Sequence, residues 1–168
     1  MRVAVTGTPG TGKTTAVDRA STDLEVVHLN ELVRAAGLTS GEDDERGSLV
    51  ADLEAIEAHL AGREDLLVES HLAHHLDADR VAVFRCHPEE LRERLLERGE
   101  AAAAAAENAE AEALDVVLSE AVGAHGHDSV YEIDTTDRAP GAVAADLEAV
   151  VAGDRDPSAG EVDFTDYL

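Results

Sequence analysis

Five short apolar runs, separated by stretches with helical spacing, constrain most strongly what this chain can form. The runs are rich in valine and leucine and do not alternate with polar residues, so strands made from them should be buried on both faces of a sheet. Strands that alternate with helices pair in parallel through right-handed crossovers. We therefore predict one three-layer α/β domain over residues 1–168, with a five-stranded parallel sheet formed by 2–6, 25–28, 65–69, 80–86 and 129–133.

The segments between these runs carry apolar residues three and four positions apart, as amphipathic helices do. Residues 37–47 contain three glycines among polar residues, which predicts a polar, mobile loop. The six alanines at 101–106 predict the plain, exposed start of a helix, because alanine has the highest helix propensity. We expect helices at 13–20, 29–36, 48–61, 88–98, 101–122 and 139–152.

The composition argues against nucleic-acid binding and favours a salty cytosol as the protein's environment. The chain holds 37 acidic and 13 basic residues, a formal net charge of −24 at pH 7, which repels bare nucleic acid. Nonspecific nucleic-acid binding is therefore not expected. The acidic excess, the abundant alanine and the twelve arginines beside a single lysine are typical of adaptation to a salty cytosol. The alternative is an ordinary acidic protein, which leaves the lack of lysine unexplained.

The sequence shows no sign of export or membrane insertion. The single cysteine, Cys86, cannot form an internal disulfide, and its apolar neighbours suggest a buried thiol at a strand end, without a catalytic role. The first residues enter a strand at once, and no window approaches roughly 18 consecutive apolar residues. We expect a cytoplasmic protein with no membrane partner.

The most specific motif is GTPGTGKTT at residues 7–15, which contains the only lysine. It follows the first strand, precedes the first helix and satisfies G-x-x-x-x-G-K-[ST], the phosphate loop of nucleotide-binding proteins. The glycines allow backbone N–H groups to fold around phosphate oxygens, and Thr14 offers a hydroxyl to Mg²⁺. Lys13 reaches the β and γ phosphates as a compact charge, which the bulkier guanidinium of arginine cannot imitate. The motif predicts binding of a nucleoside triphosphate with Mg²⁺.

Two other interpretations of this motif are weaker. Gly7, Gly10 and Gly12 do not have the G-x-G-x-x-G spacing of a dinucleotide-binding loop. The second strand also ends in His28, without an acidic residue placed for a ribose. A GTPase switch needs a second lysine in its N-K-x-D motif, and the chain has none. Both classes are therefore disfavoured.

Polar residues that could complete the site follow the third strand, in LLVESH. Glu69 ends this strand and is the candidate to hold Mg²⁺, with a solvated strand end as the alternative. His71 lies two residues further and could orient a water molecule or contact a phosphate. His74 and His75 could suggest a separate metal site, but three histidines without a cysteine or an ordered acid are more often surface groups.

Five segments occur in an order that matches a known family: GTPGTGKTT, VESH, FRCHPEELRERLLERGE, ENAEAEALDV and YEIDTT. On these segments, which span nearly the whole chain, the sequence resembles the CINAP-type nuclear adenylate kinases and their archaeal relatives, small P-loop proteins tied to ribosome maturation. The resemblance implies the P-loop fold of nucleoside monophosphate (NMP) kinases. It also implies an NMP-binding insert at about 29–52 and a small lid at about 98–108.

The resemblance implies roles for individual residues as well. Mg²⁺ would be held by Thr14 and, through water, by Glu69, while Arg34 would contact the NMP. The residues implied in catalysis are Lys13, Glu69, His71 and Arg98. Those implied in binding ATP are Gly10, Thr11, Gly12, Lys13, Thr14, Thr15 and Arg98.

The lid is where the chain departs from the family. Asn108 and Glu112 match the lid helix, but Glu100 stands where an aromatic residue is common. The alanines at 101–106 replace a stretch that usually carries polar and basic groups. Contacts of the lid with the nucleotide are therefore in question.

The implied activity is transfer of the γ-phosphate of ATP to AMP or another NMP, together with ATPase activity. Lys13, Arg34 and Arg98 would stabilise the charge of the transition state, with Arg46 as a further candidate. The alternative is an assembly ATPase that acts on a small-subunit ribosomal protein and has little NMP kinase activity.

The C-terminal tail at 154–168 carries two of the chain's four aromatic residues, Phe164 and Tyr167. A disordered end would seldom place them there. We expect the tail to dock on the domain or on a partner.

Overall fold

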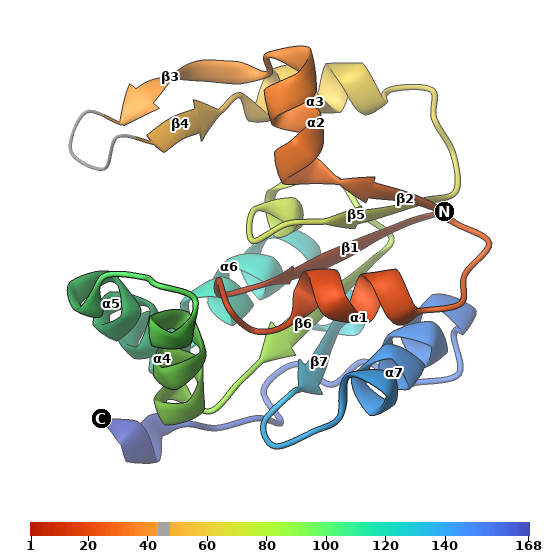
Figure 1. The fold of residues 1–168 in the computed structure, drawn as a ribbon. Coiled ribbons are helices and arrows are strands. Elements are labelled where there is room, and N and C mark those ends of the chain that lie inside the picture. The colour runs from red at the N-terminus through yellow and green to blue at the C-terminus, as the bar shows by residue number, and fades with distance from the viewer. Residues whose placement is uncertain (44–47) are drawn as a thin grey trace.

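The computed structural model describes residues 1–43 and 48–168, and its centre is a five-stranded parallel sheet (Figure 1). The strands lie in the order β2-β5-β1-β6-β7. The chain therefore builds one side of the sheet with β2 and β5 and then crosses β1 to build the other side with β6 and β7. Open α/β sheets bind ligands at such a switch point, beyond the carboxyl ends of the strands. The bounds are Arg2–Gly7 for β1, Glu25–His28 for β2, Leu66–Glu69 for β5, Arg80–Arg85 for β6 and Val130–Asp134 for β7.

Helices cover both faces of the sheet, which confirms the predicted three-layer α/β fold. Figure 1 shows α4 and α5 beside the carboxyl end of β1, away from the edge strand β2. Among the described residues, no helix combines the length and the apolar character needed to cross a membrane. The bounds are Lys13–Arg19 for α1, Leu29–Ala36 for α2, Leu53–Leu60 for α3, Pro88–Glu97 for α4, Ala102–Ala113 for α5, Val116–His125 for α6 and Pro140–Ala152 for α7.

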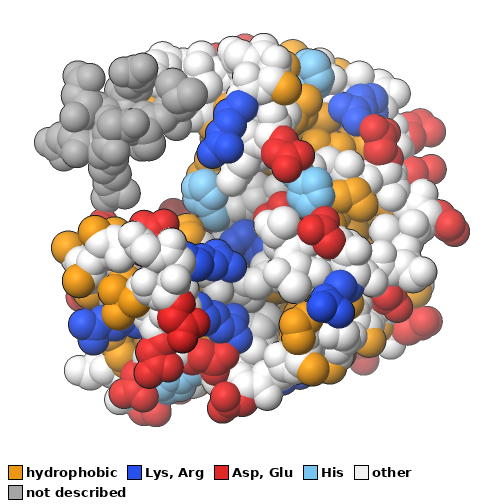
Figure 2. Space-filling model, viewed as in Figure 1, with side chains coloured by type: hydrophobic (Ala, Val, Ile, Leu, Met, Phe, Trp, Pro, Cys, Tyr) orange, Lys and Arg blue, Asp and Glu red, His pale blue; other side chains and the backbone are white. Residues whose placement is uncertain are grey.

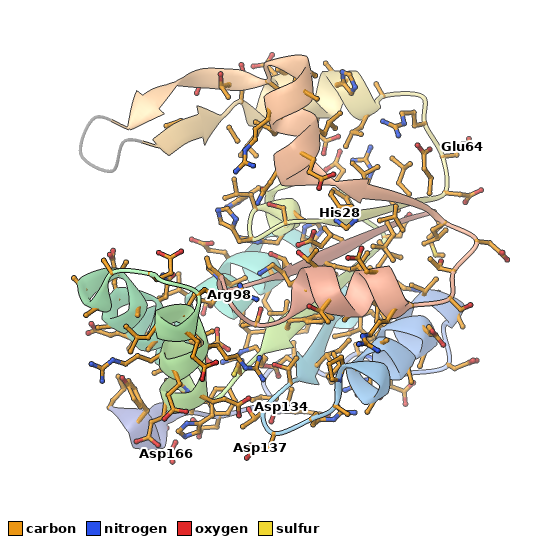
Figure 3. All side chains as sticks on the ribbon, in the orientation of Figure 1. His28, Glu64, Arg98, Asp134, Asp137 and Asp166 are labelled. Carbon is orange, nitrogen blue, oxygen red and sulfur yellow. The ribbon has the colours of Figure 1, made fainter. Side chains whose placement is uncertain are left out.

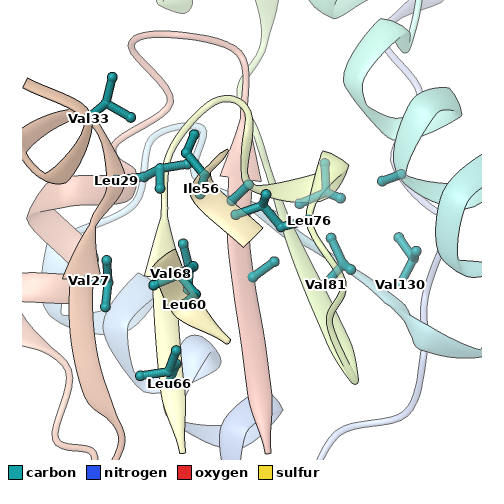
Figure 4. Close-up of a cluster of buried hydrophobic side chains, with 14 of the residues drawn as sticks. Val27, Leu29, Val33, Ile56, Leu60, Leu66, Val68, Leu76, Val81 and Val130 are labelled. Atoms are coloured by element: carbon teal, nitrogen blue, oxygen red, sulfur yellow. The ribbon is translucent and has the colours of Figure 1, made fainter. Parts of the chain in front are cut away.

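Alternate residues of the central strands supply two hydrophobic cores, because successive side chains of a strand point to opposite faces. Ala4 and Val68 belong to the core under α2, α3 and α6, part of which Figure 4 shows. Val5 and Leu67, one residue along on the same strands, belong to the core under α1 and α7. Because both faces of the sheet are buried, these strands are apolar throughout rather than alternating with polar residues.

Two predicted elements are wrong in their extent. The helix expected at 48–61 begins only at Leu53, where Asp52 caps it by accepting a hydrogen bond from the N–H of Ala55 at 3.0 Å. The preceding residues form β4 (Ser48–Ala51), which pairs antiparallel with β3 (Thr39–Asp43). A strand therefore replaces part of the loop predicted at 37–47, and the rest of that loop, 44–47, lies outside the described residues. The short segment SLVA carries no periodicity that separates strand from helix.

The single helix predicted at 101–122 is also wrong, because it is broken into α5 and α6. Asp115 sits at the break with a φ of 54°, a left-handed conformation that aspartate tolerates better than most residues. Its carboxylate pairs with the guanidinium of Arg85 on β6. The alanine run was expected to be exposed, yet Ala105 is fully buried. Ala105 packs in a cluster with Cys86 and with Leu91 and Leu95 of α4, so its burial depends on tertiary packing rather than on local pattern.

The C-terminal tail packs on the domain rather than extending from it. The side chain of Glu132 on β7 accepts hydrogen bonds from three consecutive tail N–H groups, those of residues 160–162, at 2.8–3.1 Å. Phe164 is 6% exposed and lies 5.3 Å from the guanidinium carbon of Arg85. Its ring also meets the ring of His87 edge-on, with centroids 5.4 Å apart. The tail is therefore part of the folded unit.

Replacing Phe164 by alanine should lower the free energy of unfolding by about 2–3 kcal/mol, because the substitution removes a buried aromatic ring and its contacts. Tyr167 is the matched control, since it lies further from His87, with ring centroids 6.5 Å apart, and is only partly buried. Urea denaturation of Phe164→Ala and Tyr167→Ala would compare the two. Equal losses would contradict a tail anchored by Phe164.

Candidate active site

The segment between β1 and α1 has the strained backbone of a phosphate loop. Gly10 and Gly12 have φ angles of 91° and 89°, in the region that favours glycine. A Cβ atom on Gly10 would also lie 2.9 Å from the side chains of Leu91 and Leu95 on α4. The loop thus needs glycine for its conformation and for its close packing under α4.

The only lysine of the chain is buried within this loop. The Nζ atom of Lys13 donates to the carbonyl oxygens of Gly7 at 2.8 Å and of Thr8 at 3.1 Å, and the residue is 7% exposed. Burial lowers the pKa of Lys13 to about 8, although Glu69 and Glu112 partly offset this effect. The ammonium is therefore held in place before any phosphate arrives.

Two adjoining cavities lie along the loop. The smaller, of about 170 Å³, is lined by residues that include Lys13, Asn30 and Glu69. The larger, of about 370 Å³, extends over Arg94 and Arg138 on the other side of the loop. Figure 2 shows this face of the molecule, where basic side chains and histidines border a hollow. A ligand lying across both cavities would contact the loop along its length.

The smaller cavity brings together most of the predicted site. Figure 3 shows Arg98 between the end of α4 and the start of α1, where it lines both cavities. Burial, followed by the charge of Lys13, lowers the pKa of His71, which keeps its imidazole neutral at pH 7. The predicted residues that line this cavity are Gly10, Gly12, Lys13, Thr14, Thr15, Glu69, His71 and Arg98.

Several of the residues singled out from the sequence do not line the smaller cavity. Thr11 lines the larger cavity, and its hydroxyl donates to the carbonyl of Thr8 at 2.8 Å. Arg34 is exposed on α2 and is absent from the residues that line the two cavities. Asn108 donates to the carbonyl of Ala104 within its own helix, at 3.0 Å. Arg46 lies outside the described residues.

Oxygen atoms that suit Mg²⁺ meet at the carboxyl end of β5. The hydroxyl of Thr14 donates to one carboxylate oxygen of Glu69 at 3.2 Å, and Nδ1 of His28 lies 2.9 Å from the other. This hydrogen bond with Glu69 is the main reason why the pKa of His28 is raised. Since Mg²⁺ prefers oxygen ligands, the hydroxyl and the carboxylate fit it.

Sequence reasoning missed three residues at this site. His28 was considered only as a strand end, although parallel register places it beside Glu69. Arg94 donates to the carbonyls of Gly10 at 3.4 Å and of Thr135 at 3.0 Å, so it joins the loop to the end of β7. Asn30 lines the smaller cavity. Position at a strand end was a usable signal for His28, whereas nothing distinguished Arg94 among the arginines of RERLLER.

Glu112 does not line either of the two cavities, but its side chain contacts the loop through Thr8. One carboxylate oxygen accepts a hydrogen bond from the hydroxyl of Thr8 at 2.5 Å. The other accepts from Nε of Arg85 at 2.8 Å and from the N–H of Cys86 at 3.1 Å. Arg85 also pairs with Glu132, which holds the tail. A chain of ion pairs and hydrogen bonds therefore runs from the tail through Glu132, Arg85 and Glu112 to the phosphate loop.

His74 is buried, contrary to the expectation that the histidines after β5 are surface groups. Its Nδ1 lies 2.7 Å from the hydroxyl of Thr6, and its Nε2 lies 2.9 Å from a carboxylate oxygen of Glu120. Cys86 is buried as predicted, and burial raises the pKa of its thiol to about 12.

Comparisons with known proteins show the family to which this chain is similar. Residues 3–115 match the family described as "AAA domain". A protein named "Putative adenylate kinase" from Natronomonas pharaonis is 67% identical over 168 residues, which cover 100% of both chains. One of the same name from Halobacterium salinarum is 63% identical over 169 residues, with 100% of both chains covered. Another from Methanothermobacter thermautotrophicus is 45% identical, over 99% of this chain and 98% of the relative.

The matches with the Natronomonas and Halobacterium relatives span the sheet, the phosphate loop and both cavities, whereas the AAA-domain match ends at residue 115, before β7. With its phosphate loop on a five-stranded parallel sheet, the chain therefore belongs to the AAA-domain family and, together with these relatives, to the family whose members carry the name "Putative adenylate kinase".

Proposed function

We propose that this protein is a nucleoside monophosphate kinase that transfers the γ-phosphate of ATP to AMP or another NMP. The observation that carries the proposal is the cavity in which Lys13, Glu69 and Arg98 converge on the phosphate loop. The names of the relatives favour the same reaction. Phosphoryl transfer requires chiefly that two substrates lie in line and that developing charge is neutralised.

The residues of the smaller cavity can meet these requirements. The ammonium of Lys13, already fixed by two loop carbonyls, would contact the β and γ phosphates. Thr14 and Glu69 would hold Mg²⁺, which supplies charge neutralisation between the phosphates. Arg98 is exposed at the end of α4, so it can move onto the transferred group when the lid closes. His71, neutral at pH 7, would accept or donate one hydrogen bond to position water or phosphate.

The acceptor NMP would lie between the smaller cavity and the insert formed by α2 and the β3–β4 hairpin. Arg34 is exposed on α2 and can approach a monophosphate there. Asn30, from the start of the same helix, already lines the smaller cavity. These two side chains are the proposed contacts of the acceptor.

An assay of ADP formation with and without AMP tests the proposal. Kinase activity requires that AMP stimulate ADP formation and that labelled AMP itself become ADP. If AMP neither stimulates turnover nor yields ADP, the protein is not an AMP kinase, and a panel of other monophosphates would decide the wider proposal.

A second candidate is an ATPase that acts on a small-subunit ribosomal protein during ribosome maturation. The formal net charge of −24 would suit a basic partner of that kind. Adaptation to a salty cytosol would account for the same acidity, so binding must be tested at high salt, where weak ionic contacts are screened. Pull-down with purified small-subunit proteins would test it, and the absence of a stoichiometric partner would count against it.

Replacing Glu69 by glutamine should lower Mg²⁺-dependent turnover by about 10–100-fold while changing nucleotide affinity little, because the amide keeps the size of the side chain but not its charge. Glu64 is the matched control, since Figure 3 shows it on a loop well away from Arg98 and it is exposed. Turnover and binding of a fluorescent ATP analogue would be measured for both variants. Equal losses of turnover and binding in Glu69→Gln would indicate a structural role instead.

A further inference from the structure

Two histidines that follow β5 meet an acid from a distant helix. His74 and His75 end the short 3-10 helix η1 (Ala73–His75), and Glu120 lies on α6. One carboxylate oxygen of Glu120 is 2.9 Å from Nε2 of His74 and 3.9 Å from Nε2 of His75. The potential ligand atoms of the three residues all lie within 4.8 Å of one another. The sequence showed no ordered acid beside these histidines, and the fold supplies one.

We propose that His74, His75 and Glu120 bind a divalent transition-metal ion of the Zn²⁺ class, with water in a fourth position. Two imidazole nitrogens and one carboxylate oxygen suit such ions, whereas Mg²⁺ prefers oxygen ligands. In a tetrahedral site with bonds of roughly 2.0–2.1 Å, the ligand atoms stand about 3.3 Å apart. The two distances from Glu120 lie on either side of this value, so small side-chain rotations would complete the site.

The surroundings of His74 give this imidazole the partner that a metal ligand needs on its other nitrogen. Nδ1 of His74 lies 2.7 Å from the hydroxyl of Thr6, which in turn lies 3.3 Å from the carbonyl oxygen of His71. When the Nδ1–H donates to Thr6, the hydroxyl can donate onward to that carbonyl, and Nε2 presents its lone pair toward Glu120. Metal-bound histidines are oriented in this way by a hydrogen bond from their second nitrogen.

The same contacts also satisfy the metal-free protein. In the other neutral tautomer, Thr6 donates to Nδ1 of His74 and the Nε2–H donates to Glu120. Binding of the ion would then shift one proton from Nε2 to Nδ1 without a change in the number of protons. Neither state leaves a buried polar atom of these residues without a partner.

Of the three proposed ligands, His74 is held by its surroundings, whereas His75 and Glu120 are accessible to solvent. The side chain of His74 is 2% exposed, while those of His75 and Glu120 are 35% and 48% exposed. His125 of α6 fixes the turn further, because its Nε2 lies 2.8 Å from the carbonyl oxygen of His74. An ion could therefore enter from solvent and bind against a fixed imidazole. It would join η1, just after the carboxyl end of β5, to α6.

Cobalt titration of the full chain, without a polyhistidine tag and after removal of metals by a chelator, tests the proposal. Co²⁺ replaces Zn²⁺ in such sites and reports tetrahedral coordination by intense visible d–d absorption. The titration is run with excess Mg²⁺, which occupies oxygen-rich sites such as that at Glu69. His75→Ala and Glu120→Gln are the test variants, because both side chains are exposed and the fold should survive their loss. His127→Ala is the matched control, an exposed histidine outside the cluster.

We expect both test variants to bind Co²⁺ at least about tenfold more weakly, while the control binds as the unaltered protein does. Zn²⁺ should also raise the Tm of the unaltered and control proteins but not of the test variants. Far-UV circular dichroism would establish that each variant is folded. Absence of the intense d–d absorption of tetrahedral Co²⁺, displacement of Co²⁺ by Mg²⁺, or unchanged affinity in folded His75→Ala and Glu120→Gln would each overturn the proposal.

Discussion

Replacing Lys13 by methionine should abolish phosphoryl transfer and at the same time stabilise the nucleotide-free protein. The loss of activity follows from the proposed role of the ammonium on the β and γ phosphates. The gain in stability follows from burial, which lowers the pKa of Lys13 from 10.5 to about 8. Keeping this buried group charged below pH 8 therefore costs folding free energy, on the order of 3 kcal/mol.

The pH dependence of this effect has a definite sign. The unfolded chain keeps the proton of Lys13 up to about pH 10.5, whereas the folded protein loses it near pH 8. Because the unfolded state binds more protons between these values, this group makes stability rise with pH over that window. Methionine removes the cost of keeping a buried group charged. It also removes the hydrogen-bond donor to the carbonyls of Gly7 and Thr8, which offsets part of the gain in stability. We expect a net gain of about 1–2 kcal/mol at pH 7, shrinking as the pH rises from 8 to 10.5.

Urea denaturation of both proteins at pH 7 and at several values up to 10.5, with the turnover assay run in parallel, would measure these effects. Lys13→Arg is the control that keeps the positive charge, and it too should lose turnover, because the guanidinium is too bulky for the loop. A Lys13→Met variant less stable than the unaltered protein at pH 7 would contradict the proposed cost of burial. Retained turnover would show that the site is misassigned.

Replacing Arg85 by methionine should lower the free energy of unfolding by about 3–5 kcal/mol, the largest loss expected for a single change in this chain. Arg85 is 1% exposed and pairs with Glu112 and Glu132, which are 3% and 1% exposed. The variant leaves both carboxylates buried without their cation. It also loses the contact of Arg85 with Phe164, so the tail should become more accessible to protease.

Urea denaturation and limited proteolysis of Arg85→Met would measure both effects. Arg92→Met is the matched control, an exposed arginine on α4 whose loss should change stability by less than about 0.5 kcal/mol. A second variant, in which Glu112→Gln and Glu132→Gln accompany Arg85→Met, removes the unpaired charges and should recover part of the stability. If Arg85→Met and Arg92→Met have equal effects, the buried ionic network does not stabilise the fold.

The elements that could be predicted from the sequence are those that depend on local pattern. Each strand of the parallel sheet agrees with its predicted position to within one residue at either end, because strands buried on both faces are apolar throughout. The phosphate loop was predicted for a similar reason, since its glycines, lysine and threonine lie within nine consecutive residues. The β3–β4 hairpin and the break at Asp115 were missed because neither has a distinct local pattern.

The sequence by itself determined the sheet and the phosphate loop, and it led to the class of ligand proposed for that loop, since each depends on residues that are neighbours along the chain. Only the tertiary structure brought Glu120 to His74 and His75, Arg85 to Glu132, and Thr8 to Glu112, which is 104 residues further along. The physical reason is that such contacts depend on how helices pack on the sheet. The sequence alone does not distinguish a charged side chain that is exposed to solvent from one that forms a buried ion pair.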